Sequence, residues 1–73
     1  MTAPATPAEE LLSDREVTVL LLAADGCTSR EIAGILHLAR VTITATFTHI
    51  FDVLGADGRA NAVFLALKKG LIP

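Results

Sequence analysis

The sequence predicts a small all-α domain of four helices, and three observations support that fold class. Apolar residues recur at spacings of three and four along most of the chain, which is the period of a helix with one buried side. Within the periodic part of the chain, two segments match Ser/Thr-x-x-Glu, a pattern that caps the N-termini of helices. The chain has 73 residues, of which 52% are hydrophobic, so it is long enough for one domain and too apolar to stay unfolded.

The first helix is expected over residues 14–24. Ser13 and Glu16 form one capping motif, in which the serine oxygen accepts a backbone hydrogen bond and the glutamate side chain reaches back to the serine amide. Asp25 and Gly26 then end the helix, because glycine tolerates the positive φ of a helix C-terminus. The residues that this spacing predicts to be buried are Val17, Leu20, Leu21 and Ala24.

The second and third helices are expected over residues 29–36 and 40–54. Thr28 and Glu31 form the second capping motif. The third helix is rich in β-branched residues, which favour strands, but its apolar residues extend over three helical turns and Gly55 supplies a stop. The residues predicted to be buried are Ile32, Ile35 and Leu36 on the second helix, and Ile43, Phe47, Ile50 and Leu54 on the third.

A fourth helix is expected over residues 58–69, capped by Asp57 and ended by Gly70. Its predicted inward residues are Ala60, Val63, Ala66 and Leu67. Leu65 falls on the other side, so this helix is apolar nearly all round and has a second surface to bury. One interpretation is a two-fold homodimer through Ala62, Phe64, Leu65 and Lys69. The other is contact of Leu65 with the first helix or with the N-terminal residues.

Composition and spacing exclude several classes of protein. Residues 1–10 have no periodicity and are expected to be a flexible tail before a domain over residues 11–73. No apolar segment reaches the roughly 20 residues that cross a bilayer, and no secretory signal is present, so a cytoplasmic location is expected. Cys27, His37 and His49 lack partners at metal-ligand spacing, so neither a metal nor a cofactor is expected. The chain offers no set of nucleophile, base and orienting group, which argues against an enzyme.

The order of the predicted helices is that of a helix-turn-helix, in which two helices are joined by a turn of three or four residues. From Leu12 to Ile72 the sequence also resembles, without a gap, the LuxR/GerE-type helix-turn-helix domain. The residues that carry this resemblance are Leu12-Ser13, Arg15-Glu16, Leu20, Leu22, Ala24-Asp25-Gly26, Arg30-Glu31-Ile32-Ala33, Leu36, Thr42-Ile43, Ile50, Leu54-Gly55, Arg59, Ala62-Val63 and Leu67-Lys68-Lys69-Gly70-Leu71-Ile72. The resemblance implies a bacterial transcriptional regulator that binds double-stranded DNA as a dimer, here expected as a stand-alone domain.

By this resemblance the third helix would enter the major groove of DNA. A step of about 100° per residue turns Val41, Ala45, Thr48 and Asp52 away from the buried residues of this helix. Similar domains usually carry lysine at the positions of Val41 and Thr44, whereas residues 28–54 here have no net charge. The expected DNA contacts are Thr28, Ser29, Arg30, Arg40, Val41, Thr42, Thr44, Ala45, Thr48 and His49.

Two functions remain open from the sequence. The first is a small bacterial transcriptional regulator that binds double-stranded DNA as a homodimer with weak attraction to phosphates. The alternative is a protein-interaction module that binds DNA weakly or not at all and pairs with a related regulator or with the transcription machinery. The net charge of −2 and the neutral third helix favour this alternative.

Overall fold

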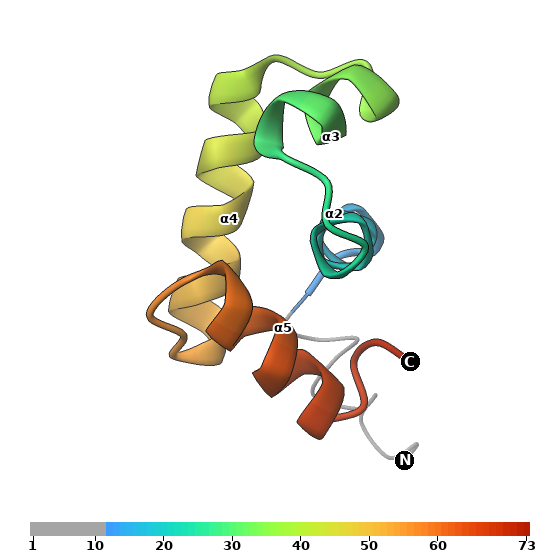
Figure 1. The fold of residues 1–73 in the computed structure, drawn as a ribbon. Coiled ribbons are helices and arrows are strands. Elements are labelled where there is room, and N and C mark those ends of the chain that lie inside the picture. The colour runs from blue at the N-terminus through green and yellow to red at the C-terminus, as the bar shows by residue number, and fades with distance from the viewer. Residues whose placement is uncertain (1–11) are drawn as a thin grey trace, which may run out of the picture.

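The computed structural model describes residues 12–73, and these residues form four helices and no strand (Figure 1). The helices are α2 (Asp14–Ala24), α3 (Ser29–Leu36), α4 (Arg40–Leu54) and α5 (Arg59–Lys68). The all-α prediction is confirmed, with the last helix one residue shorter at each end than expected. The predicted tail over residues 1–10 lies outside the described residues, as does residue 11.

The helices pack around α4, the longest of them. In Figure 1, α3 lies near the N-terminal end of α4 and α5 near its C-terminal end, while α2 is viewed along its axis between them. Contacts join α2 to the other three helices, and α4 also contacts α3 and α5. Among the described helices, none covers the outer side of α4.

Both predicted capping motifs are present. Glu16 N donates to Ser13 Oγ at 3.1 Å, and Ser13 N donates to Glu16 Oε1 at 2.7 Å. Thr28 and Glu31 exchange the same two bonds at 3.1 and 2.8 Å. These bonds satisfy amides that have no partner within the helix, which fixes where α2 and α3 begin.

The start of α5 differs from the prediction. Gly58, rather than Asp57, is the N-cap residue, and no side chain caps the helix. The backbone amide of Asp57 instead donates to Asn61 Oδ1 at 3.1 Å. The expected role of Asp57 as a capping residue is therefore wrong, because its position is one residue ahead of the cap.

The turn between α3 and α4 depends on a left-handed residue. His37 has φ 57° and ψ 43°, the conformation that usually calls for glycine. The Leu38 amide then donates to the carbonyl of Ala33 at 2.9 Å, which closes the end of α3. His37 is exposed and serves as a turn residue of the helix-turn-helix.

The core lies between the four helices, and its largest fully buried side chains are Leu20, Ile32, Ile43, Ile50 and Val19. All four residues predicted for the buried side of α4 are buried. On α2 the buried residues are Val19, Leu20 and Ala23, so the predicted burial of Leu21 and Ala24 is wrong and Val17 is only half-buried. Residues 19–24 of this helix are all apolar, so the spacing fits two possible buried faces that are shifted by one residue. On α3, Ala33 is buried in place of Ile35, which is 53% exposed.

The buried face of α5 also differs from the prediction. Ala62 and Ala66 are fully buried, whereas Ala60 and Leu67 are exposed. Ala62 therefore belongs to the core of the domain, and its predicted place in a dimer interface is wrong. Leu65 is half-buried against the core, so the exposed apolar residues of α5 are Phe64 and Leu67, at 58% and 48% exposure. The fully buried residues of α5 are thus two alanines one helical turn apart.

Candidate nucleic-acid interface

The outer side of α4 is exposed, as the helical spacing predicts. Val41, at 74% exposure, begins this face, and the other exposed residues on it are Thr44, Ala45, Thr48 and Asp52. The opposite side of the helix holds the buried Ile43, Phe47 and Ile50. The face thus consists of methyl and hydroxyl groups with one carboxylate at its C-terminal end.

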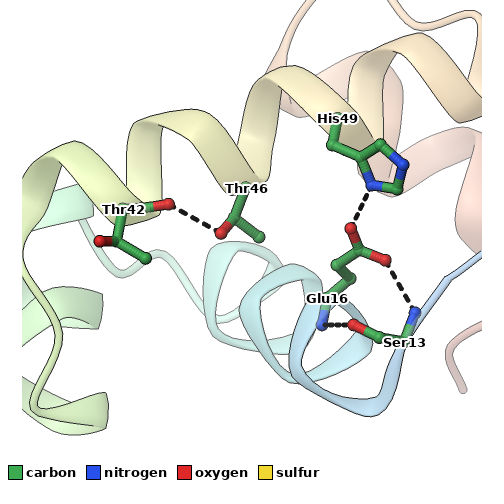
Figure 2. A network of polar contacts seen from close by, with 5 residues as sticks. All are labelled: Ser13, Glu16, Thr42, Thr46 and His49. Carbon is green, nitrogen blue, oxygen red and sulfur yellow. Dashed lines mark hydrogen bonds and ion pairs between the residues drawn. The ribbon is translucent and has the colours of Figure 1, made fainter.

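The threonines of α4 bond to their own helix. Thr46 Oγ1 donates to the carbonyl of Thr42 at 2.7 Å (Figure 2), and Thr48 Oγ1 donates to the carbonyl of Thr44 at 3.1 Å. Each bond uses the hydrogen of the hydroxyl group. Thr48 therefore presents a methyl group and oxygen lone pairs to the outside, rather than a free donor.

The remaining predicted contacts lie where α3 and α4 begin. Arg30 and Arg40 are exposed, and neither forms an ion pair within residues 12–73. The Thr28 oxygen accepts the capping bond from the Glu31 amide, which leaves its hydrogen free to donate. Ser29 is half-buried and is bonded to another residue of the domain. The predicted DNA contacts thus lie on α4 and at the first residues of two helices.

His49 has a structural role that the sequence did not reveal. Its Nδ1 is paired with Glu16 Oε2, while the other oxygen of Glu16 accepts the bond from the Ser13 amide (Figure 2). The pair joins α4 to the first turn of α2. Burial opposes ionisation of Glu16, but the bonds from Ser13 and His49 and the attraction of the His49 charge outweigh it and lower the pKa of this carboxyl group.

Arg59 connects three parts of the domain at the start of α5. Its Nη1 donates to the carbonyl of Cys27, and its Nη2 donates to Ser29 Oγ at 2.8 Å. The guanidinium carbon lies 4.4 Å from the centre of the Phe47 ring, within the range of a cation–π interaction. Arg59 thus holds α5 against the α2–α3 turn and the inner side of α4.

A groove of about 300 Å³ lies beside the outer face of α4. Its lining residues come from the starts of α3 and α5 and from one flank of α4: Ser29, Thr44, Phe47, Thr48, Phe51 and Arg59. Sequence reasoning predicted Ser29, Thr44 and Thr48 as contacts but missed Arg59. The one signal for Arg59 was its match to the LuxR/GerE pattern, because its partners lie about 30 residues away in the chain.

Among residues 12–73, no group of three or more His, Cys, Asp or Glu side chains is placed to hold a metal ion. Cys27 is a half-buried free thiol. No helix in this part of the chain has the length and apolar character needed to span a membrane.

The family model described as bacterial regulatory proteins of the luxR family matches residues 10–66. The chain belongs to the luxR family. This membership confirms the resemblance seen in the sequence, and the matched residues include α3 and α4, the two helices joined by a short turn.

Similar proteins are regulators that are longer than this chain. The transcriptional regulatory protein YdfI of Bacillus subtilis (strain 168) is 38% identical over 64 residues, which cover 88% of this chain and 30% of YdfI. The oxygen regulatory protein NreC of Staphylococcus aureus (strain JH9) is 39% identical over 71 residues, which cover 97% of this chain and 33% of NreC. This LuxR-type chain thus spans about a third of the length of these relatives.

The fold is also similar to that of a solved structure. The crystal structure of the response regulator ChrA, from a heme-sensing two-component system, matches with a TM-score of 0.81 and 28% identity. The match covers 99% of this chain and 33% of ChrA. The family match and this fold confirm the predicted LuxR/GerE-type helix-turn-helix domain, and the relatives that share it are transcriptional or response regulators.

Proposed function

We propose that this LuxR-type domain binds double-stranded DNA and regulates transcription, with α4 placed in the major groove. The observation that carries the proposal is the exposed outer face of α4, which lies on the second helix of a helix-turn-helix and is not covered by any other described helix. An α-helix with its side chains has a diameter of about 10–12 Å, which matches a major groove about 12 Å wide.

The chemistry of this face favours apolar readout of bases. Val41, Ala45 and the methyl group of Thr48 can contact the methyl group of thymine, and the lone pairs of Thr48 can accept from an exocyclic amine. The face carries no arginine or lysine to bond the two acceptors of guanine. We therefore expect a preference for sites rich in A·T pairs rather than for a guanine at a fixed position.

Attraction to the DNA backbone is expected to be weak. Arg30 and Arg40 are exposed cations beside the predicted contact face, but Asp52 lies on the face itself. Neutralisation of phosphates supplies most of the nonspecific affinity of DNA-binding proteins. Binding should therefore require low salt and a dimer, which doubles the number of contacts.

The second part of the proposal is a homodimer formed through α5. Phe64 and Leu67 are large apolar side chains that remain exposed on this helix, and Lys69 follows at its end. A two-fold interface would cover them with the same residues of a second copy, and Leu65 would extend the patch with its half-exposed side. Two copies of α4 would then read half-sites about 34 Å apart.

Selection from bacterial genomic DNA fragments tests the main proposal. Immobilised protein would be mixed with the fragments in buffer of about 50 mM or about 150 mM salt. It should retain a specific set of fragments, and the amount of DNA recovered should fall steeply at the higher salt. A protein that retains no fragment at the lower salt would contradict DNA binding by this domain.

A variant with added cations gives a second test. Replacing Val41 and Thr44 with lysine should raise affinity for any duplex by about tenfold or more at low salt, because both positions lie on the proposed contact face. The matched control places the same two charges on α2, at the exposed Thr18 and Ala24. Equal effects of the two variants would show that α4 has no special place in binding.

The alternative function is a protein-interaction module, which the neutral outer face of α4 favours. Such a module would pair through α5 with a related regulator or with the transcription machinery. This alternative would be supported over DNA binding if the protein retained no DNA but formed a stable complex with such a protein partner, and if Phe64→Asp disrupted that complex.

A further inference from the structure

We propose that the groove beside α4 binds one phosphate group of the DNA backbone, and that Arg59 supplies its positive charge. The inference rests on the DNA-binding function proposed above and deepens it by naming a backbone site. It starts from the positive charge of Arg59, which no carboxylate among its contacts balances.

The charge of Arg59 is not balanced by a carboxylate. Its two hydrogen bonds go to neutral oxygens, a backbone carbonyl and a serine hydroxyl. Within residues 12–73 the ion pair of Glu16 and His49 is the only one, and it lies between α2 and α4. A half-buried guanidinium that faces neutral partners at a groove is a position where an anion would be stabilised.

Arg59 also has donors to spare. A guanidinium group carries five N–H donors in a planar fork, and two of them are used by Cys27 and Ser29. Those bonds and the Phe47 ring fix the plane of the fork, so further donors are oriented before any ligand arrives. A phosphate bound there would require little ordering of the side chain.

The other polar groups of the groove complete an anion site. Ser29 Oγ accepts from Arg59, so its own hydrogen is free to donate. The Thr44 hydroxyl makes no hydrogen bond within the described residues, and it lines the same groove. Phe47 and Phe51 form an apolar floor that limits competing water and can pack against a sugar. A cation, two hydroxyl donors and an apolar floor suit one nucleotide of a DNA backbone.

The position of the groove fits a backbone contact. A helix that fills the major groove turns its outer face to the bases and its two flanks to the sugar–phosphate walls. The groove, with Arg59 of α5 in its lining, lies along the flank of α4 that carries Phe51 and meets the outer face at Thr44 and Thr48. The other flank carries His49, which is paired with Glu16. The domain therefore contacts the two sugar–phosphate strands of the major groove unequally, with the stronger contact on the side of Arg59.

The salt dependence of DNA binding tests this inference. Binding of a random-sequence duplex would be followed by fluorescence anisotropy between 50 and 200 mM salt for wild type, Arg59→Gln and Arg59→Lys. Loss of one phosphate contact per subunit removes two contacts from the proposed dimer, so the fall in affinity over this range should be about 12-fold smaller in Arg59→Gln, or about 3.5-fold smaller if a single subunit binds. Arg59→Lys keeps the charge but not the fork, so it should keep the wild-type slope with a lower affinity. Arg15→Gln removes an exposed cation from α2 and is the matched control.

Arg59→Gln also removes bonds that stabilise the domain, so a second variant is needed to distinguish loss of phosphate binding from loss of stability. Ser29→Asp places a carboxylate beside Arg59 Nη2 and at the first residue of α3, where a negative charge is favourable. It should leave the melting temperature unchanged or higher while reducing DNA affinity by about tenfold at 50 mM salt. A wild-type slope in Arg59→Gln, or undiminished binding by Ser29→Asp, would overturn the proposed phosphate site while leaving DNA binding intact. No binding by the wild-type protein would overturn both proposals.

Discussion

Replacing Glu16 with alanine should destabilise the domain more than the equivalent change at Glu31. Each glutamate closes a capping motif of the same geometry, with bonds of 2.7 and 3.1 Å at Glu16 and of 2.8 and 3.1 Å at Glu31. Only Glu16 also pairs with a histidine of another helix. The difference between the two variants therefore measures the contribution of the contact between α2 and α4.

The expected loss of unfolding free energy depends on how exposed the Glu16–His49 pair is. Loss of a capping interaction costs about 1 kcal/mol, which applies to both variants. The Glu16 side chain is 13% exposed but that of His49 is 55% exposed, so the pair should add only about 0.2–1 kcal/mol, the range of exposed ion pairs. In a domain of this size, the total of about 1–2 kcal/mol for Glu16→Ala corresponds to a fall in melting temperature of roughly 5–15 °C.

Urea denaturation followed by circular dichroism would measure both variants, together with His49→Ala and the double variant of Glu16 and His49. The cycle should give a coupling energy above about 0.3 kcal/mol, the scatter expected for independent sites. Equal losses in Glu16→Ala and Glu31→Ala, with no coupling in the cycle, would refute the view that this pair holds α4 against α2.

Four further predictions concern Glu16, Ala62, Phe64 and His37. Because the folded-state pKa of Glu16 is lowered, its contribution to stability is complete above its unfolded pKa of about 4.3 and is lost as pH falls through the folded value; Glu16→Gln should flatten this acid dependence in a urea titration series. Ala62→Leu should cost about 1–3 kcal/mol in the same assay, since Ala62 is fully buried, and a neutral effect would contradict its place in the core. Phe64→Asp should yield a monomer in analytical ultracentrifugation, and a persistent dimer would exclude the α5 interface. His37→Gly should raise stability by up to about 1 kcal/mol, because glycine adopts a φ of 57° without strain; a lower melting temperature would show that the His37 side chain contributes more than its backbone costs.

The sequence predicted the fold well where polar residues define the faces of a helix. On α4, threonines alternate with the apolar residues, so the buried set from Ile43 to Leu54 and the exposed Val41 and Ala45 were both identified correctly. On α2 and α5 the apolar residues are nearly continuous, and spacing alone could not decide between adjacent faces. The burial of Ala62 and the exposure of Leu21 were missed for this reason.

The candidate site could be predicted only in part. The exposed residues of α4 follow from helical geometry, but the groove depends on how three helices meet. Arg59 reaches Cys27 and Ser29 across about 30 residues of sequence, and His49 reaches Glu16 across 33. Contacts at such separations depend on the packing angles between helices, which no local pattern specifies. The single pattern that included Arg59 was the family resemblance, and it gave no indication of what the side chain touches.

The bonds that the threonines of α4 make to their own helix have a consequence for the entropy of binding. A lysine loses about 1.5–2 kcal/mol of rotamer freedom when a partner orders its side chain. Thr48 is short and is already held by the carbonyl of Thr44, and Val41 and Ala45 have few or no rotamers to lose. The outer face of α4 is therefore almost as ordered before binding as after it. A partner that covers this face gains little from charge, but it also loses little to the freezing of side chains.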